Sequence, residues 1–260
     1  MNDAGAASVD PIDFATWAGL VGRGAAELGI SVDDDALRRL WEYARTLREW
    51  SRRMNLVGSS APALMARVHI LDSMAVLKFL PEAARLCADV GSGAGLPGMV
   101  AALAAPGVHW ALIDSSRKRC RFLTHVQSAL GVTNVTVHCA RAEDIGRDSA
   151  MREAHDTAVS RAVGPLAVVA EYCLPLVRVG GQCLALKGPA VEKEVEAASA
   201  AVEALGGRIC DVVRYCLPLG DEQRRAVIID KLVATPDRFP RRVGVAAKRA
   251  REVDRQHDGV

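Results

Sequence analysis

The stretch DVGSGAGLPG, residues 89–98, decides how this chain folds, because its glycines join one short apolar run to another. Glycines between a buried strand and a helix let a ligand approach the backbone closely. Read from Gly93, the stretch matches the dinucleotide pattern G-x-G-x-x-G; read from Asp89, it matches D-x-G-x-G-x-G. A tight turn that binds nothing is the third interpretation, and the acids described next argue against it.

The register of the loop favours the reading from Asp89. Apolar strand character ends at Val90, so the turn begins at Gly91 and Gly98 packs a helix. The Asp89 carboxylate would repel a pyrophosphate but suits a ligand that carries an ammonium and a sulfonium. Asp114 ends the next strand, where a carboxylate suits ribose hydroxyls of either ligand. S-adenosylmethionine is therefore favoured over NAD.

Outward from the loop, strand-like and helical segments alternate. The strand-like runs are LCADVG, VHWALID, VTVHC, DTAVSRA and QCLALKG, and the helical patterns lie at 97–104, 116–130, 142–148, 165–177 and 190–205. This alternation predicts an α/β fold with a parallel sheet. Two further strands, 208–217 and 225–233, have no helix between them and predict an antiparallel hairpin. Five parallel strands and a hairpin predict the Rossmann-like class I S-adenosylmethionine-dependent methyltransferase fold.

The segments on either side of this domain lack its alternation of strands and helices. Helices are expected from Asp10, as N-cap, to about 28, over 33–53 and over 68–79. The tail contains two prolines and several basic residues. We therefore expect an N-terminal helical extension (1–82), a methyltransferase domain (83–235) and a basic C-terminal tail (236–260).

Composition narrows the class of protein. The 260 residues are 50% hydrophobic and carry a formal net charge of only +2, so basic residues matter only where they cluster. The cysteines, 7 in number, form no C-x-x-C motif, which disfavours a zinc site or a disulfide framework. No signal peptide or membrane-length apolar run is visible, so we expect a cytoplasmic protein without a metal.

Further motifs resemble one family, the bacterial small-subunit ribosomal RNA methyltransferase G family, also called glucose-inhibited division protein B. They are RVHILDSM (67–74), DVGSGAGLPG, LIDSSRKRCRFL (112–123), ARAED (140–144), VSRAV (159–163) and LALKG (184–188). The tail FPRRVGVAAKRA resembles the family's P-R-x-x-G-x-P-x-K-x-P but lacks its later prolines. The resemblance covers roughly residues 30–245.

The resemblance implies S-adenosylmethionine as methyl donor and N7 of a guanine in 16S rRNA, guanine 527, as acceptor. The partner would be the small ribosomal subunit. Together with the loop argument, it gives this set of expected cofactor-binding residues: Asp89, Gly91, Gly93, Leu96, Asp114, Ala142, Glu143 and Arg161. The expected RNA-binding candidates are Arg67, His69, Lys187, Arg241 and Lys248.

The chemistry requires no catalytic side chain. Guanine N7 carries a free lone pair and loses no proton on attack, so alignment and desolvation suffice and no general base is expected. Cysteine-based chemistry is disfavoured because no cysteine follows a proline.

Several candidates also have plain structural interpretations. His69 and Asp72 share a helix face, where they either line the substrate site or form a local pair. Arg161 either binds cofactor or pairs with Asp89 or Asp114. Lys187 either contacts RNA phosphate or is a solvated strand end.

Two other function classes stay open at this point. One is an NAD-dependent oxidoreductase, which uses the loop as read from Gly93. The other is a non-catalytic ribosome-assembly factor that keeps the fold. A monomer is expected.

Overall fold

A seven-stranded sheet with strand order β3-β2-β1-β4-β5-β7-β6 lies at the centre of the molecule. The computed structural model describes residues 12–58, 61–246 and 248. The strands are β1 (Leu86–Val90), β2 (His109–Ile113), β3 (Val135–His138), β4 (His155–Arg161), β5 (Val177–Lys187), β6 (Gly207–Cys216) and β7 (Gln223–Lys231).

Strands β1 to β5 are parallel, and β7 runs antiparallel between β5 and β6. The predicted fold class, five parallel strands followed by an antiparallel hairpin, is confirmed. The carboxyl ends of β1, β2 and β4 therefore meet at one edge of the sheet, where open α/β sheets bind ligands.

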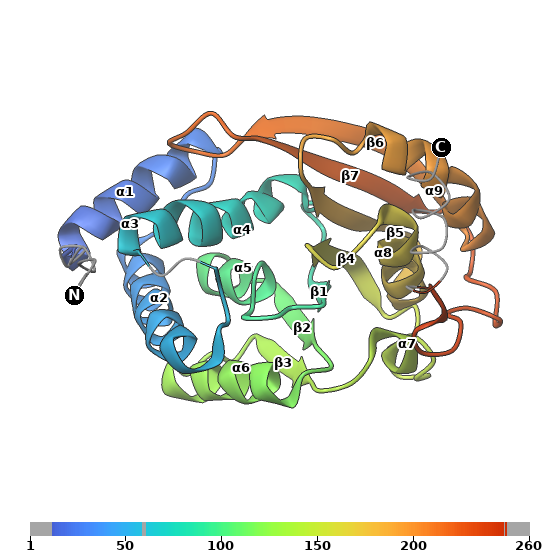
Figure 1. The fold of residues 1–260 in the computed structure, drawn as a ribbon, viewed down its shortest axis with the longest axis horizontal. Coiled ribbons are helices and arrows are strands. Elements are labelled where there is room, and N and C mark those ends of the chain that lie inside the picture. Colours follow the sequence, from blue (N-terminus) through green and yellow to red (C-terminus); the bar gives the residue numbers. More distant parts are fainter. Residues whose placement is uncertain (1–11, 59–60, 247, 249–260) are drawn as a thin grey trace, which may run out of the picture.

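Helices cover both faces of the sheet (Figure 1). One face carries α1 (Phe14–Glu27), α2 (Asp34–Met54), α3 (Pro62–Met65), the π-helix η1 (Ala66–Leu71), α4 (Asp72–Met74), the 3-10 helix η2 (Ala75–Phe79), α5 (Gly98–Ala104) and α6 (Arg117–Ala129). The other carries α7 (Ala142–Ile145), α8 (Leu166–Cys173), the 3-10 helix η3 (Leu174–Leu176) and α9 (Glu192–Ala204).

The N-terminal helices share a core with the sheet. Trp17 of α1 and Tyr43 of α2 are fully buried in the same hydrophobic cluster as Met99 and Trp110. The predicted boundary at residue 82, between the N-terminal extension and the methyltransferase domain, stays a prediction.

Two helices differ clearly in extent from the sequence prediction, and a third, expected over 142–148, ends at Ile145. The helix expected over 68–79 begins at Pro62, whose ring suits the first turn of a helix, and it passes through α, π and 3-10 geometry. The helix expected over 165–177 ends at Cys173, because Pro175 lacks an N–H and crowds the carbonyl four residues back.

The first two helices each begin after an aspartate that caps the first turn. Asp10, the predicted N-cap, lies outside the described residues; α1 is capped by Asp13, which accepts from the Thr16 N–H at 2.8 Å. The helix predicted over 33–53 is confirmed as α2, capped by Asp33.

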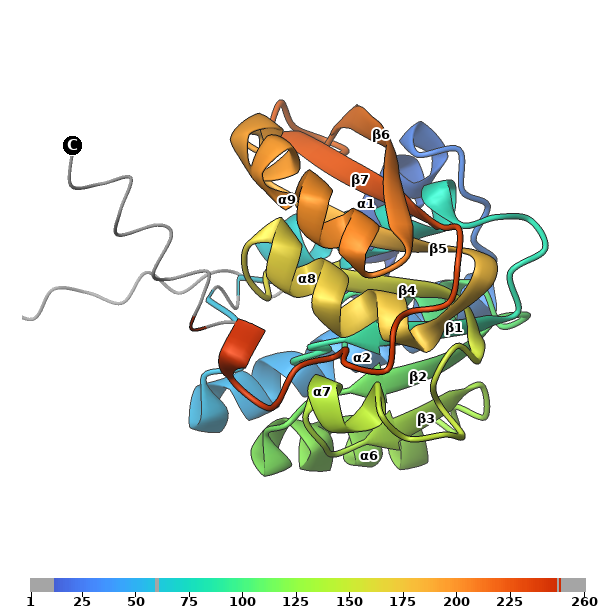
Figure 2. The same ribbon diagram turned by 90° about the vertical axis from the view of Figure 1, so that its right-hand side faces the viewer.

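The chain beyond β7 runs between α8 and α7 (Figure 2), and we call residues 235–246 the strap. Arg152 donates to the carbonyls of Thr235 (2.6 Å) and Phe239 (2.9 Å). Arg241 pairs with Glu171 on α8, its Nε lying 2.9 Å from either carboxylate oxygen. The first part of the predicted tail is thus bound to the domain, and residues 249–260 lie outside the described residues.

Candidate active site

The glycine loop turns sharply at the end of β1. The Gly91 N–H donates to the Ile113 carbonyl at 2.8 Å, and Gly91 has a φ of +75°. A Cβ at Gly91 would lie 2.4 Å from Cγ2 of Val163. Glycine is therefore required by both the backbone conformation and the space.

Gly98 has the packing role that its position after Pro97 predicts. A Cβ there would lie 2.4 Å from Cδ2 of Leu112 and 2.8 Å from the Asp89 side chain. The glycine brings the first turn of α5 against the sheet.

Asp89 lies beneath the loop and is fully buried. Its Oδ2 accepts from the Gly98 N–H at 2.8 Å, whereas its Oδ1 has no hydrogen-bond partner within the described chain. Burial raises the pKa of this carboxyl to about 7. It lines neither of the cavities described below, so its contact with a cofactor stays a prediction.

Asp114 follows β2 and organises the neighbouring loop. Its Oδ2 accepts from the Gly93 N–H at 2.9 Å, and its Oδ1 accepts from the Ser116 N–H at 2.8 Å. Arg119 pairs with Oδ2 at 3.3 Å. One carboxylate thus joins the glycine loop to the start of α6.

A cavity of about 300 Å³, here called the loop cavity, opens beside Asp114. It brings together four of the predicted cofactor residues, Gly91, Asp114, Ala142 and Glu143. Gly93 and Leu96 do not line this cavity. The Gly93 N–H donates to the Asp114 carboxylate, and the Leu96 side chain packs in the core.

The strap touches one wall of the loop cavity. Glu143 is buried, and its Oε1 accepts from the Gly244 N–H at 2.9 Å. Tyr172 lines the same wall; burial, and then the nearby Glu143 charge, raises the pKa of its phenol to about 12. Sequence reasoning missed Tyr172, whose only signal is a phenol next to the single acid, Glu171, of a mostly apolar helix.

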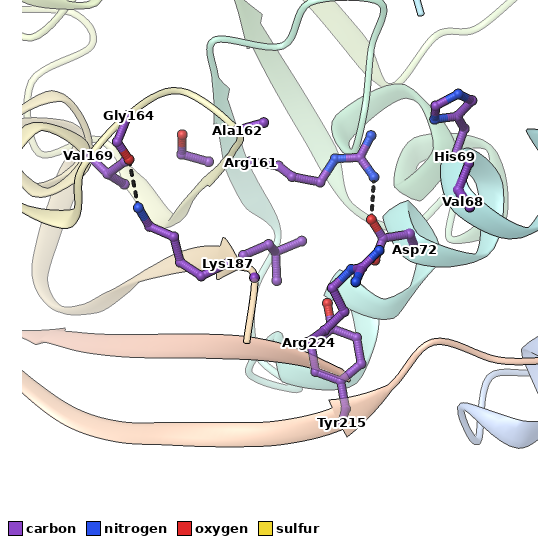
Figure 3. A pocket seen from close by; sticks show the side chains of 13 residues that line it. Val68, His69, Asp72, Arg161, Ala162, Gly164, Val169, Lys187, Tyr215 and Arg224 are labelled. Carbon is purple, nitrogen blue, oxygen red and sulfur yellow. Dashed lines mark hydrogen bonds and ion pairs between the residues drawn. The ribbon is translucent and has the colours of Figure 1, made fainter. Parts of the chain in front are cut away.

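A second cavity of about 410 Å³, the arginine cavity, lies beyond the end of β4 (Figure 3). Arg161 donates from Nη1 to Oδ2 of Asp72 at 2.8 Å, and Arg224 of β7 donates from Nε to Oδ1 at 3.3 Å. The alternative that Arg161 forms an ion pair with Asp89 or Asp114 is wrong, because its ion-pair partner is Asp72. Asp72 begins α4, which faces the end of β4.

His69 and Asp72 both line the arginine cavity. Asp72 pairs with two arginines from separate strands of the sheet, so the helix-face pattern alone did not reveal its role. Arg224 was missed in the sequence, although an arginine pair at the start of an apolar strand is a usable signal.

The two cavities share one residue, Ala162. Its φ of +58° is unusual for a residue with a side chain, and such strain concentrates at functional sites. The two cavities therefore adjoin at Ala162, with Asp114 lining one and Arg161 lining the other, at the carboxyl edge of the sheet.

The structure gives most of the RNA-binding candidates internal partners. Arg67 pairs with Glu222, and Arg241 pairs with Glu171. Lys187 is not a solvated strand end: its Nζ donates to the Gly164 carbonyl and to Glu194, both at 2.6 Å. Lys248 is exposed, near the end of the described chain.

Within residues 12–58, 61–246 and 248, neither a metal-binding cluster nor a membrane-spanning helix is found. No cluster of three or more His, Cys, Asp or Glu side chains there could hold a metal ion. None of the helices in those residues is both long enough and apolar enough to cross a bilayer.

Comparison with known proteins confirms the resemblance. Residues 36–219 match the family model described as rRNA small subunit methyltransferase G. The chain is 43% identical over 243 residues to the Ribosomal RNA small subunit methyltransferase G of Symbiobacterium thermophilum, covering 91% of this chain and 99% of that protein. It is 40% identical over 227 residues to the protein of the same name from Pelotomaculum thermopropionicum, covering 87% and 95%.

Proposed function

Because this chain belongs to the rRNA small subunit methyltransferase G family, we propose that it methylates N7 of one guanine in 16S rRNA, with S-adenosylmethionine as donor. The methyl acceptor is the guanine that the family resemblance implies. The observation that supports this best is the pair of cavities that meet at Ala162, at the carboxyl edge of the parallel strands.

The loop cavity fits the nucleoside part of the donor. Asp114 closes β2, where a carboxylate accepts hydrogen bonds from ribose hydroxyls. Gly91 leaves the backbone bare at the cavity wall, since no side chain fits against Val163. Ala142 and Glu143 form the opposite wall beside Tyr172.

The arginine cavity suits the acceptor base. Guanine offers O6 as an acceptor beside N7 and N–H donors on its opposite edge, while the N7 lone pair must stay free to attack the methyl group. Arg161 and Arg224 supply N–H donors, and each Asp72 oxygen keeps acceptor capacity beyond the single arginine contact that it makes. Both edges of a guanine thus have complementary groups in this cavity.

The residues act by alignment. S-adenosylmethionine, when bound, supplies a methyl group already activated on a sulfonium. As the N7–carbon bond forms, the carbon–sulfur bond breaks, its electron pair goes to sulfur, and the base takes the positive charge. No proton leaves N7, so the protein's part is to hold the base in line and exclude water.

A binding and transfer experiment tests the proposal. Calorimetry should give binding of S-adenosylmethionine but not of NADH, and Asp114→Ala should weaken that binding at least tenfold. The wild type should transfer labelled methyl groups to 16S rRNA. NADH binding in place of S-adenosylmethionine would favour the oxidoreductase, whereas S-adenosylmethionine binding without transfer would favour a non-catalytic assembly factor.

A further inference from the structure

Among the basic side chains that the structure describes, one group is paired with internal acids and another group has no partner. Arg67, Lys187 and Arg241, three of the expected RNA contacts, belong to the first group. Arg45 on α2 also belongs to it, since it pairs with Glu42 at 3.2 Å. Charge held by an internal acid contributes little attraction to a distant phosphate.

A second set of cations is exposed and has no partner. Five of its members lie at the end of α2 and in the first turns of α6, and we call these five the basic ridge: Arg52, Arg53, Arg117, Lys118 and Arg121. In the part of the chain that the structure describes, none of these side chains forms an ion pair, hydrogen bond or ring contact. Glu49, the acid nearest in sequence on α2, forms no ion pair with them either.

Packing of α2 against α6 brings the members of the ridge together. Trp50 packs against Phe122 and His125, with ring centroids 5.5 and 5.1 Å apart. Near the other end of α6, Arg39 donates to the Leu130 carbonyl, so the two helices run antiparallel.

One helical turn beyond this aromatic contact, both helices become basic. Lys118 and Arg121 lie four residues before Phe122 and His125, on the same side of α6. Arg53 lies three residues after Trp50 on α2 and faces the same end. The end of α2 and the start of α6 therefore form one basic surface.

The ridge adjoins the loop cavity. Arg117 opens α6 three residues after Asp114, and Arg119 between the ridge residues lines the cavity. On the α2 side, the Tyr43 hydroxyl donates to the Ala94 carbonyl of the glycine loop at 2.7 Å. A polyanion lying on the ridge would thus reach the edge of the sheet where the cavities open.

We propose that the basic ridge is the surface on which the phosphate backbone of the substrate RNA docks. The proposal rests on the proposed function, and it adds which face of the protein the RNA covers. The hollow beside Trp50 gives this surface a concave side, and Glu49, Arg52, Arg53 and Met54 line it. Closely grouped cations that outnumber the one acid beside them, Glu49, suit an RNA backbone, whose phosphates are evenly charged.

A double variant that removes two ridge charges, compared with a matched double variant elsewhere, tests the proposal. Arg53→Gln with Lys118→Gln removes one cation from each helix, and the matched control is Arg45→Gln with Arg208→Gln. Both control arginines are exposed but paired, with Glu42 and Asp230 respectively. The probes are small ribosomal subunits from cells that lack this gene and the protein-free 16S rRNA extracted from them.

The ridge variant should bind RNA about 10- to 30-fold more weakly in 0.1 M salt, as expected for two lost phosphate contacts. The slope of log affinity against log salt should become shallower by about 1.4. Affinity for S-adenosylmethionine should stay as in the wild type, and the control should match the wild type in every measurement.

The possible failures are distinguishable. If the wild type methylates the RNA but the ridge variant binds it with unchanged affinity and salt slope, the ridge proposal is wrong and the proposed function stands. If the wild type neither binds nor methylates either RNA probe, both proposals are overturned.

Discussion

The guanidinium of Arg161, at the end of β4, lies 2.8 Å from the carboxylate of Asp72, at the start of α4. The same carboxylate receives Arg224 from β7. One acid therefore joins a central strand, the hairpin and the N-terminal helices at the cavity that we assign to the acceptor base.

Removing Asp72 should destabilise the fold. Asp72→Ala leaves two arginines, both mostly buried, without their acceptor, so we expect a loss of about 3 kcal/mol in the free energy of unfolding. Glu42→Ala breaks an exposed pair and should cost less than about 1 kcal/mol. Urea titration measures the free energy of unfolding of both variants. Equal losses would mean that the Asp72 ion pairs do not stabilise the fold more than an exposed pair does.

The ion pair between the strap and α8 gives a second prediction. Arg241→Ala leaves Glu171, which is almost fully buried, as an unpaired carboxylate, so stability should fall by about 3 kcal/mol. Arg242 next to it is exposed, and Arg242→Ala should change stability by less than about 0.5 kcal/mol. Thermal and chemical unfolding of the two variants compare them directly; similar stabilities would contradict a bound strap.

The glycine loop allows a substitution test with a conformational control. Gly91→Ala places a Cβ against Val163 at the wall of the loop cavity, so S-adenosylmethionine should bind at least about tenfold more weakly. Gly131 also has a positive φ, +59°, but has open space around it and follows α6. Gly131→Ala should therefore show the conformational cost without a change in cofactor affinity, as measured by calorimetry.

Asp89 should make stability depend on pH. Burial raises the pKa of this carboxyl to about 7, whereas the unfolded chain releases the proton near pH 4. The folded state thus holds the extra proton between these values, and its contribution to stability falls as pH rises from about 4 to 7.

Asp89→Asn keeps an acceptor for the Gly98 N–H but cannot ionise. Relative to the wild type, the variant should gain stability across that pH range and then stay level above pH 7. The comparison needs unfolding curves without ligand at each pH. A stability difference that is constant from pH 4 to 8 would contradict the raised pKa.

The local sequence was sufficient for the strands, the glycine loop and the acid after β2. Their patterns depend on residues close together in the chain: apolar runs, the turn at Gly91, and Asp114 after the next strand. The helix ends at Pro62 and Cys173 were missed because prolines acted at positions that the periodicity did not mark.

Contacts between distant segments could not be read from the sequence. Asp72 and Arg161 are 89 residues apart, and Glu143 and Gly244 are 101 apart. Which cations are neutralised is likewise a tertiary property, so the sequence could not separate Arg241, which is paired, from the basic ridge, which is not. A lone Glu171 in an apolar helix was the one local sign that a buried cation partner existed.

Mapping the methylated atom tests the central claim most directly. Purified protein, labelled S-adenosylmethionine and small subunits from cells lacking the gene are incubated, and the 16S rRNA is digested and analysed by mass spectrometry. We predict one 7-methylguanosine at a single position, absent from the untreated rRNA and formed in a ratio approaching one per subunit. Label on another atom or base, or no transfer to subunits and free 16S rRNA alike, would contradict the account.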